Sequence, residues 1–245
     1  MKIAILLVLV LNGVRAGAAP LVLSGINGSL NSDISWLVVK EAYAQLGVKA
    51  VWRRLPAGRS LQMADAGKGI DGELFRISGV ARRYPNLIRV PTPVNRREGT
   101  AFARQDLTLN GWSGLARYRV GIQTGIKFAE RGTRGIPRTV VSTNEQLFRM
   151  LAGGRIDVIV VSLVSGLKTL KQLRLSGVHP LRPPLQSYDL YHYLHKKHRS
   201  LVPGLNAVLQ KMQADGRTGQ IRRDFIQNFM KSIPPPERRV GSPGR

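Results

Sequence analysis

The sequence contains no cysteine, which excludes disulfide bonds, thiolate metal sites and thiol chemistry. Acidic residues are scarce as well: 14 Asp and Glu stand against 38 Lys and Arg, for a formal net charge of +24. Such a charge favours anionic partners, among them nucleic acid, phospholipid surfaces, wall polymers and acidic solutes. The basic residues are spread along the chain instead of gathered in one arm, and we expect no specific nucleic-acid binding.

Beyond its first residues the chain also lacks any apolar stretch long enough for a membrane helix. The first residues contain Lys2, an apolar run over 3–11, and the small-residue sequence Ala16-Gly17-Ala18. This order is typical of a signal peptide cut before Ala19, and a buried first strand is the alternative. We therefore predict that residues 1–18 are removed and that the protein is periplasmic.

The first part of the mature chain alternates apolar strand patterns with helical ones. Strands are predicted over 21–24, 48–52 and 70–75, with helices between them. The first helix is expected to be capped by Ser32 or Asp33 and to run to Leu46. A strand-helix-strand-helix-strand succession predicts a parallel sheet with crossover helices.

A second α/β succession follows Pro91-Thr92-Pro93, and a second proline-rich break lies at Pro180, Pro183 and Pro184. In this second part, Ser142 and Glu145 are predicted to form a capping box that opens a helix. Prolines hold extended backbone and suit crossings between lobes. We predict an α/β fold with one lobe from 19–92 plus 186–232, a second from 93–185, and a disordered tail over 233–245.

A polar turn follows the predicted strand 70–75, where open α/β sheets commonly bind ligands. Arg76, Arg82 and Arg83 lie in or beside this turn, and an arginine there can hold a carboxylate through paired hydrogen bonds. The alternative, in a chain this basic, is that the three arginines are solvated surface residues that bind no ligand. Two lobes joined by two crossings also predict a cleft that closes around a small molecule.

The order and spacing of several segments resemble the periplasmic solute-binding proteins of the type-2 fold, specifically the polar-amino-acid-binding family (extracellular solute-binding protein family 3). The resemblance covers essentially the whole mature chain. It is carried by segments that are weak individually and informative together: 56–61, 69–72, 120–125, 154–157, 193–198 and 201–205. The resemblance implies a two-lobed type-2 fold with two crossings, no cofactor, and a binding role.

The resemblance also implies ligand-binding residues. Arg83, twelve residues after Asp71, falls at the family's carboxylate-binding arginine. Other positions that the family places against the ligand are occupied by Ser78, Arg76, Thr124, Gly125 and Lys127, and the loop after the first strand adds Asn27. A helix start with glycine suits an anion.

One position departs from the family pattern. Many members have an aspartate where this chain has Ser162, and that aspartate pairs with the ammonium of an amino-acid ligand. A hydroxyl accepts a hydrogen bond without neutralising a cation. We therefore expect a carboxylate-bearing solute, an amino acid or a related organic acid, and favour an anionic or dicarboxylate-like one over an ordinary amino acid.

Glu73 lies on the strand beside the expected cleft and is a further candidate ligand-binding residue. Cyclohexadienyl dehydratases share the fold that the resemblance implies and use a cleft carboxylic acid. A structural ion pair with a nearby arginine is the alternative that we favour. His192, His195 and His198 have neither the convergence nor the carboxylates of a metal site, and no metal is predicted.

The sequence thus predicts a monomeric, non-enzymatic binding protein that captures a carboxylate-bearing solute, with an ABC permease or a membrane sensor as its partner. An enzyme of the same fold and a basic exported protein that binds polyanions are the alternatives.

Overall fold

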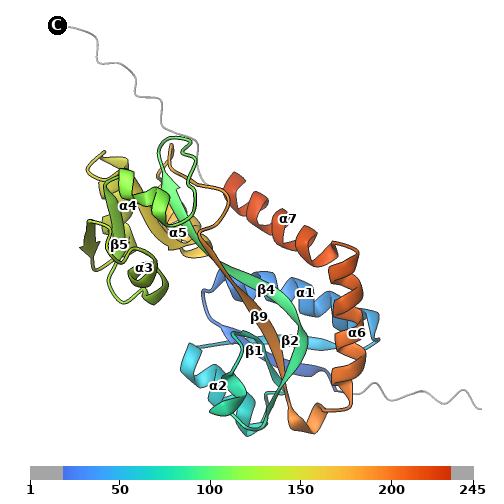
Figure 1. The fold of residues 1–245 in the computed structure, drawn as a ribbon. Helices are drawn as coiled ribbons and strands as arrows, with labels where there is room; N and C mark the ends of the chain where they lie inside the picture. Colours follow the sequence, from blue (N-terminus) through green and yellow to red (C-terminus); the bar gives the residue numbers. More distant parts are fainter. Residues whose placement is uncertain (1–18, 233–245) are drawn as a thin grey trace, which may run out of the picture.

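The computed structural model describes residues 19–232, which form two lobes connected by the long strands β4 and β9 (Figure 1). The predicted signal peptide and the predicted tail lie outside the described residues. Within the described part of the chain, no helix combines the length and hydropathy that crossing a bilayer requires.

Lobe 1 is built on a sheet in which β1 pairs in parallel with both β2 and β3, and β3 pairs antiparallel with β9. Its apolar core lies between this sheet and its helices. The elements of lobe 1 are β1 (Leu21–Ile26), α1 (Leu30–Gln45), β2 (Ala50–Leu55), α2 (Ala57–Ala66), β3 (Gly72–Arg76) and α6 (Leu201–Ala214).

Lobe 2 repeats the arrangement around β5, which pairs in parallel with β6 and β7. Core clusters lie on the two faces of this sheet, so its strands are apolar nearly throughout. The elements of lobe 2 are β5 (Val120–Gln123), α3 (Lys127–Gly132), β6 (Arg138–Val141), α4 (Asn144–Ala152), β7 (Val158–Ser162), α5 (Leu163–Leu173) and β8 (His179–Pro180).

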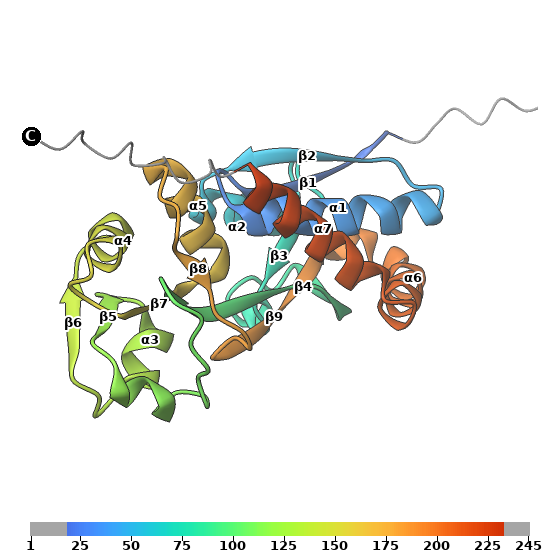
Figure 2. The same ribbon diagram turned by 90° about the horizontal axis from the view of Figure 1, so that it is seen from above.

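The strands β4 (Leu87–Ala103) and β9 (Gln186–His195) belong to both sheets. β4 pairs with β9 as far as Gly99 and with β7 from Gly99 onward, so the sheet of lobe 1 continues into that of lobe 2 (Figure 2). The prolines 91 and 93 lie inside β4, where register shifts accommodate residues without an N–H.

The first crossing therefore lies further along the chain than the sequence predicts. Val90 and Val94 flank the predicted boundary at 92/93, yet both belong to the core of lobe 1. Pro91 and Pro93 lie at an irregularity within one continuous strand, and this strand passes from the sheet of lobe 1 to that of lobe 2 at Gly99.

Helix α7 (Arg217–Lys231) is the second correction, because it does not pack on lobe 1 alone. Ile221 belongs to the core of lobe 1, whereas Ile226, Phe229 and Met230 pack against the core of lobe 2. In Figure 1 this helix runs from α6 towards α5, alongside the crossing strands. It is a third connection between the lobes.

Two helix starts also differ from the sequence prediction. α1 begins at Leu30 after Ser29, earlier than expected, and Ser32 lies inside the helix with its hydroxyl donating to the Ile26 carbonyl. α4 has the predicted capping box one residue later, formed by Thr143 and Gln146. Ser and Thr at adjacent positions offer equivalent caps, so sequence alone does not choose between them.

Asp71 ties the start of β3 to its neighbours. Its carboxylate accepts hydrogen bonds from the backbone N–H of Val22 at 2.8 Å and from His198 at 2.8 Å, and it pairs with Lys197 at 2.7 Å. Burial raises the pKa of this carboxyl, but the hydrogen bonds from Lys197, Val22 and His198 outweigh burial and lower the pKa to about 2.

We expect Asp71→Asn to lower the free energy of unfolding at pH 7. A depressed carboxyl pKa gives stability that is complete above the ordinary value of 3.8 and lost as the pH falls through about 2. The wild-type protein should therefore lose more stability than Asp71→Asn over that window in urea unfolding. Asp215→Asn, at an exposed helix end, is the control, and equal acid sensitivity of Asp71→Asn and wild type would contradict the prediction.

Candidate functional site

A cavity of about 1010 Å³ lies between the lobes. Lobe 1 contributes the loop from Ile26 to Asn31 and the side chain of Ile77. Lobe 2 contributes residues of α3, the start of α4 and one side of α5, and the crossing strands contribute Arg97 and Tyr188. A volume of this size is adequate for a small-molecule ligand.

The N-termini of α1, α4 and α5 all reach this cavity. Ser29 caps α1 and Ser162 caps α5 in extended conformation, and neither side chain makes a capping hydrogen bond. At α4 the Thr143 cap is already satisfied by Gln146. Free backbone N–H groups and the positive end of the helix dipole favour an anion at the starts of α1 and α5.

The charged side chains that line the cavity are mostly basic. Arg97, Lys127, Arg131 and Lys168 line it, and Glu145 is the lining carboxylate. Lys127 is paired with Glu130 at 2.9 Å, and Lys168 donates to the Gly28 carbonyl of the opposite lobe at 3.1 Å. The lining therefore carries an excess of positive charge where the helix N-termini converge.

The structure brings four of the predicted site residues to this cavity: Asn27, Gly125, Lys127 and Ser162. The expectation for the segment 124–127 is only partly met, because its backbone N–H groups already have acceptors. The N–H of Thr124 bonds to Val141, and that of Gly125 bonds to the Glu130 carboxylate at 2.7 Å. Gly125 therefore lines the cavity without offering a free backbone N–H, and Lys127 contributes its charge.

Arg83 and Ser78 do not line the cavity, and both are exposed. After β3 the chain turns at Gly79, which has a φ of 88°, and enters a 3-10 turn over Val80–Arg82. Arg83 follows that turn on the protein surface, and the residue of this segment that faces the cavity is Ile77. The spacing of twelve residues from Asp71 would bring Arg83 to the cavity only if the turn after β3 had a different shape.

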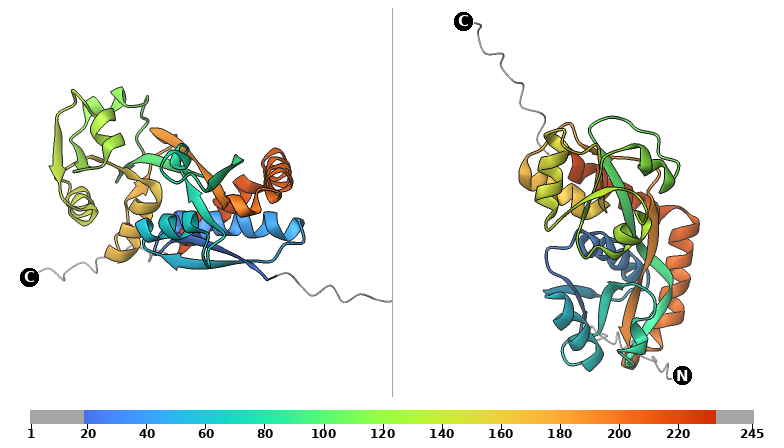
Figure 3. Two further views of the ribbon diagram at one scale, coloured as in Figure 1. Left: turned by 90° about the horizontal axis from the view of Figure 1, so that it is seen from below. Right: turned by 60° about the vertical axis from the view of Figure 1, so that its left-hand side comes forward.

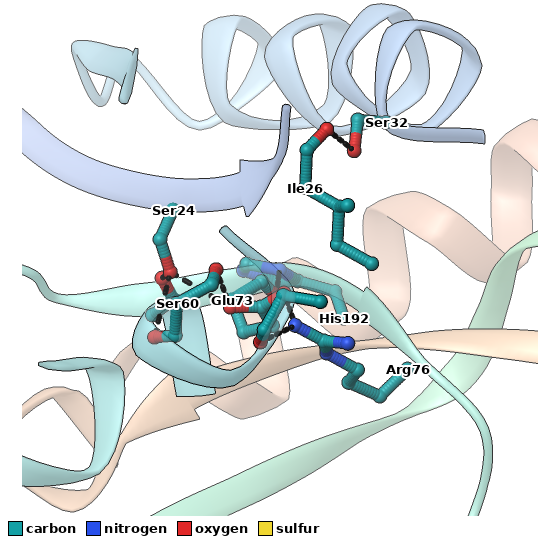
Figure 4. A network of polar contacts seen from close by, with 9 residues as sticks. Ser24, Ile26, Ser32, Ser60, Glu73, Arg76 and His192 are labelled. Carbon is teal, nitrogen blue, oxygen red and sulfur yellow. Dashed lines mark hydrogen bonds and ion pairs between the residues drawn. The ribbon is translucent and has the colours of Figure 1, made fainter. Parts of the chain in front are cut away.

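Glu73 and Arg76 form a buried ion pair beneath the site instead of lining it (Figure 4). Arg76 approaches Glu73 Oε1 at 2.7 Å and also donates to the Ala57 carbonyl at 2.9 Å. The hydroxyls of Ser24 and Ser60 donate to Glu73 Oε2. Complete burial raises the pKa of Glu73, and Arg76, Ser60 and Ser24 oppose that rise.

This network joins β1, α2 and β3, and it continues to β9 through His192. His192 lies 2.8 Å from the Glu73 carbonyl and 3.0 Å from the Tyr43 hydroxyl, and burial lowers its pKa to about 4. It is a neutral core histidine. Within residues 19–232 no group of histidine and carboxylate side chains has the arrangement of a metal site.

Neither Arg76 nor Glu73 lines the cavity, and the ion pair favoured for Glu73 is the arrangement found. Strand periodicity places both on a segment beside the cleft, but the side chain of Glu73 points into lobe 1 and holds the guanidinium with it. A reaction that needs Glu73 as a cleft acid has no geometric support.

No protein-family model matches the sequence. The chain is 32% identical over 205 residues to an uncharacterised protein of Shewanella oneidensis, and the match covers 79% of this chain and 76% of the relative. The chain belongs to the same family as this Shewanella protein. The family relationship assigns no activity.

Solved structures share the fold at low sequence identity. A histidine kinase sensor domain with similarity to periplasmic binding proteins gives a TM-score of 0.54 at 17% identity, covering 86% of this chain and 97% of that chain. An ancestral cationic amino acid solute-binding protein gives 0.61 at 16%, covering 84% and 95%. An amino acid ABC transporter substrate-binding protein from Streptococcus pneumoniae, bound to L-arginine, gives 0.53 at 17%, covering 88% and 96%.

The two-lobed type-2 fold of the periplasmic solute-binding proteins is thereby confirmed, as the resemblance implied. These structural relatives are a sensor domain and two solute-binding proteins.

Sequence reasoning missed Arg97, Arg131, Lys168 and Tyr188 as lining residues. Arg131 and Lys168 lie on helices, where a basic residue is indistinguishable from a solvated one. Arg97 and Tyr188 offered a signal, because both lie in segments that had to connect two lobes. Recognising that signal requires the strand register, which pairs Arg97 with Tyr188.

We expect Glu73→Gln to destabilise the protein by about 3 kcal/mol, because it leaves the Arg76 charge in a largely buried position without its partner. The double variant Glu73→Gln/Arg76→Met should recover part of that loss, as measured by urea unfolding. Arg59→Gln, an exposed site on α2, is the control. A Glu73→Gln protein as stable as wild type would refute the structural role.

Proposed function

We propose that this protein is a periplasmic solute-binding protein that captures a small carboxylate-bearing anion in the cavity between its lobes. The observation that carries the proposal is the lining itself: basic side chains of lobe 2 and of the crossing strand β4 border a space that helix N-termini of both lobes reach. Such an environment stabilises negative charge.

Binding is coupled to closure of the lobes. The backbone crosses between the lobes in β4 and β9 (Figure 3). Small dihedral changes near Gly99 can therefore rotate one lobe against the other. A solute that contacts Asn27 on lobe 1 and Ser162 on lobe 2 favours the closed state by its differential affinity.

The proposed ligand differs from the amino acids named for some structural relatives. The relative from Streptococcus pneumoniae is described as bound to L-arginine. In this chain the cavity carries Lys127, Arg131 and Lys168, and Ser162 supplies a hydroxyl instead of a carboxylate. A cationic side chain in the ligand would be repelled there, whereas a second acidic group would be attracted.

The proposed partner is an ABC permease or a membrane sensor, since the fold occurs in both settings among the structural relatives. Either partner would bind the closed form of the protein in preference to the open form. The N-terminal pattern supports export to the periplasm, and the protein is proposed to act as a monomer.

Calorimetric titration with succinate, L-glutamate, L-arginine and L-lysine tests the proposal. We expect saturable binding of succinate or L-glutamate, no binding of L-arginine or L-lysine, and about tenfold weaker binding in Arg131→Gln, because a charged hydrogen bond or ion pair is lost. Lys40→Gln, exposed on α1 outside the cavity, should bind as the wild type does.

Preference for L-arginine or L-lysine would overturn the proposed ligand class. The polyanion alternative makes a different prediction: retention on heparin that falls steeply with salt and is insensitive to succinate. Turnover of prephenate or arogenate would instead indicate an enzyme.

A further inference from the structure

The cavity has a floor made by the crossing strands, and one cross-strand pair stands out on it. Arg97 on β4 is paired directly with Tyr188 on β9, and both residues line the cavity. Side chains of directly paired residues in an antiparallel ladder project from the same face. A guanidinium and a phenol thus lie side by side on strands that belong to both lobes.

The neighbouring residues of β4 show that this face is distinct from the opposite one. Glu98 is buried on the other face, where it pairs with Arg182 at 2.9 Å and with Arg222 of α7 at 3.1 Å. Arg96, like Glu98, does not line the cavity. Strand alternation accordingly assigns Arg97 to the ligand side and its two neighbours to the α7 side.

The same row of the sheet brings in lobe 2. Gly99 is paired with Gln186 of β9 on one side and with Ser162 of β7 on the other. Because Gly99 has no side chain, the ring of Phe128 packs directly over it. Phe128 follows Lys127 on α3, so α3 and the cap of α5 both lie beside the position that Arg97 occupies.

Both members of the pair lack partners within the described residues. The Arg97 guanidinium makes no hydrogen bond or ion pair with any part of residues 19–232, in contrast to Arg76, Lys127 and Lys168. The Tyr188 hydroxyl is buried and has no hydrogen-bond partner there. A buried hydroxyl without a partner is costly, and an oxygen of a bound solute would satisfy it.

We infer that Arg97 and Tyr188 together bind an acidic group of the solute, in the role that the sequence assigned to Arg83. This inference rests on the proposed function. The guanidinium donates paired hydrogen bonds to a carboxylate, and the phenol donates a third to the same group. Because both residues lie at the junction of the lobes, this anchor is in place before closure, and the cations of α3 and α5 then meet the far end of the solute.

Calorimetric titration with succinate and L-glutamate tests the inference in four variants. Arg97→Gln should weaken the wild-type binding of these anions by about 10-fold to 100-fold, since it removes charged hydrogen bonds. Tyr188→Phe should weaken it by about fivefold. Arg96→Gln is the matched control, one residue away with the same loss of charge, and it should stay within about twofold of wild type, as should Arg83→Gln.

Thermal unfolding of each variant checks that the fold is intact, and Arg97→Lys, which keeps the charge but not the forked geometry, gives an intermediate loss if paired hydrogen bonds matter. If the wild type binds these anions and Arg97→Gln binds them equally well, the inference is overturned while the proposed function stands. A larger loss in Arg83→Gln than in Arg97→Gln would also overturn it. Failure of the wild type to bind any of these anions would overturn both.

Discussion

The antiparallel ladder between β4 and β9 is the constraint on which the rest of the molecule depends. It closes the sheet of lobe 1, passes its outer strand to lobe 2 at Gly99, and supplies the floor of the cavity. Ladder hydrogen bonds fix the register, and the register decides which side chains face the cavity, because a slip of one residue would exchange Arg97 for Glu98. The same ladder therefore connects the two lobes and determines which side chains line the cavity.

The two faces of this ladder serve different purposes. On the side away from the cavity, Glu98 is 5% exposed and is held by Arg182 and Arg222, and burial lowers the pKa of Arg222. These pairs connect the crossing strands to α7, whose apolar residues contact the cores of both lobes. In the proposed function, a helix that spans the junction would restrict closure to rotations that keep its contacts with both cores.

The sequence was sufficient for the architecture and insufficient for the details of the site. Alternating strand and helix patterns predicted two α/β lobes, and four of the candidate residues, Asn27, Gly125, Lys127 and Ser162, lie at the cavity. The predicted ligand contacts that do not line the cavity are residues whose side-chain direction depends on the local conformation of the chain. Gly79 redirects the chain before Arg83, and the buried carboxylate of Glu73 holds Arg76 in lobe 1. Residue spacing carries no information about either, since both depend on contacts with distant segments.

The overall charge of +24 and the charge of the cavity are separate properties. Surface charges on an exposed face are screened by salt within about 8–10 Å, so most of the basic residues have little influence on a solute in the cleft. Arg97, Arg131 and Lys168 line the cavity itself. In the proposed function, closure of the lobes removes water from this space and strengthens their attraction for an anion. Lys168 already reaches across to the Gly28 carbonyl, a neutral acceptor. An anionic solute would be a stronger acceptor for the same ammonium group, so the contact that now links the lobes can also favour anion capture.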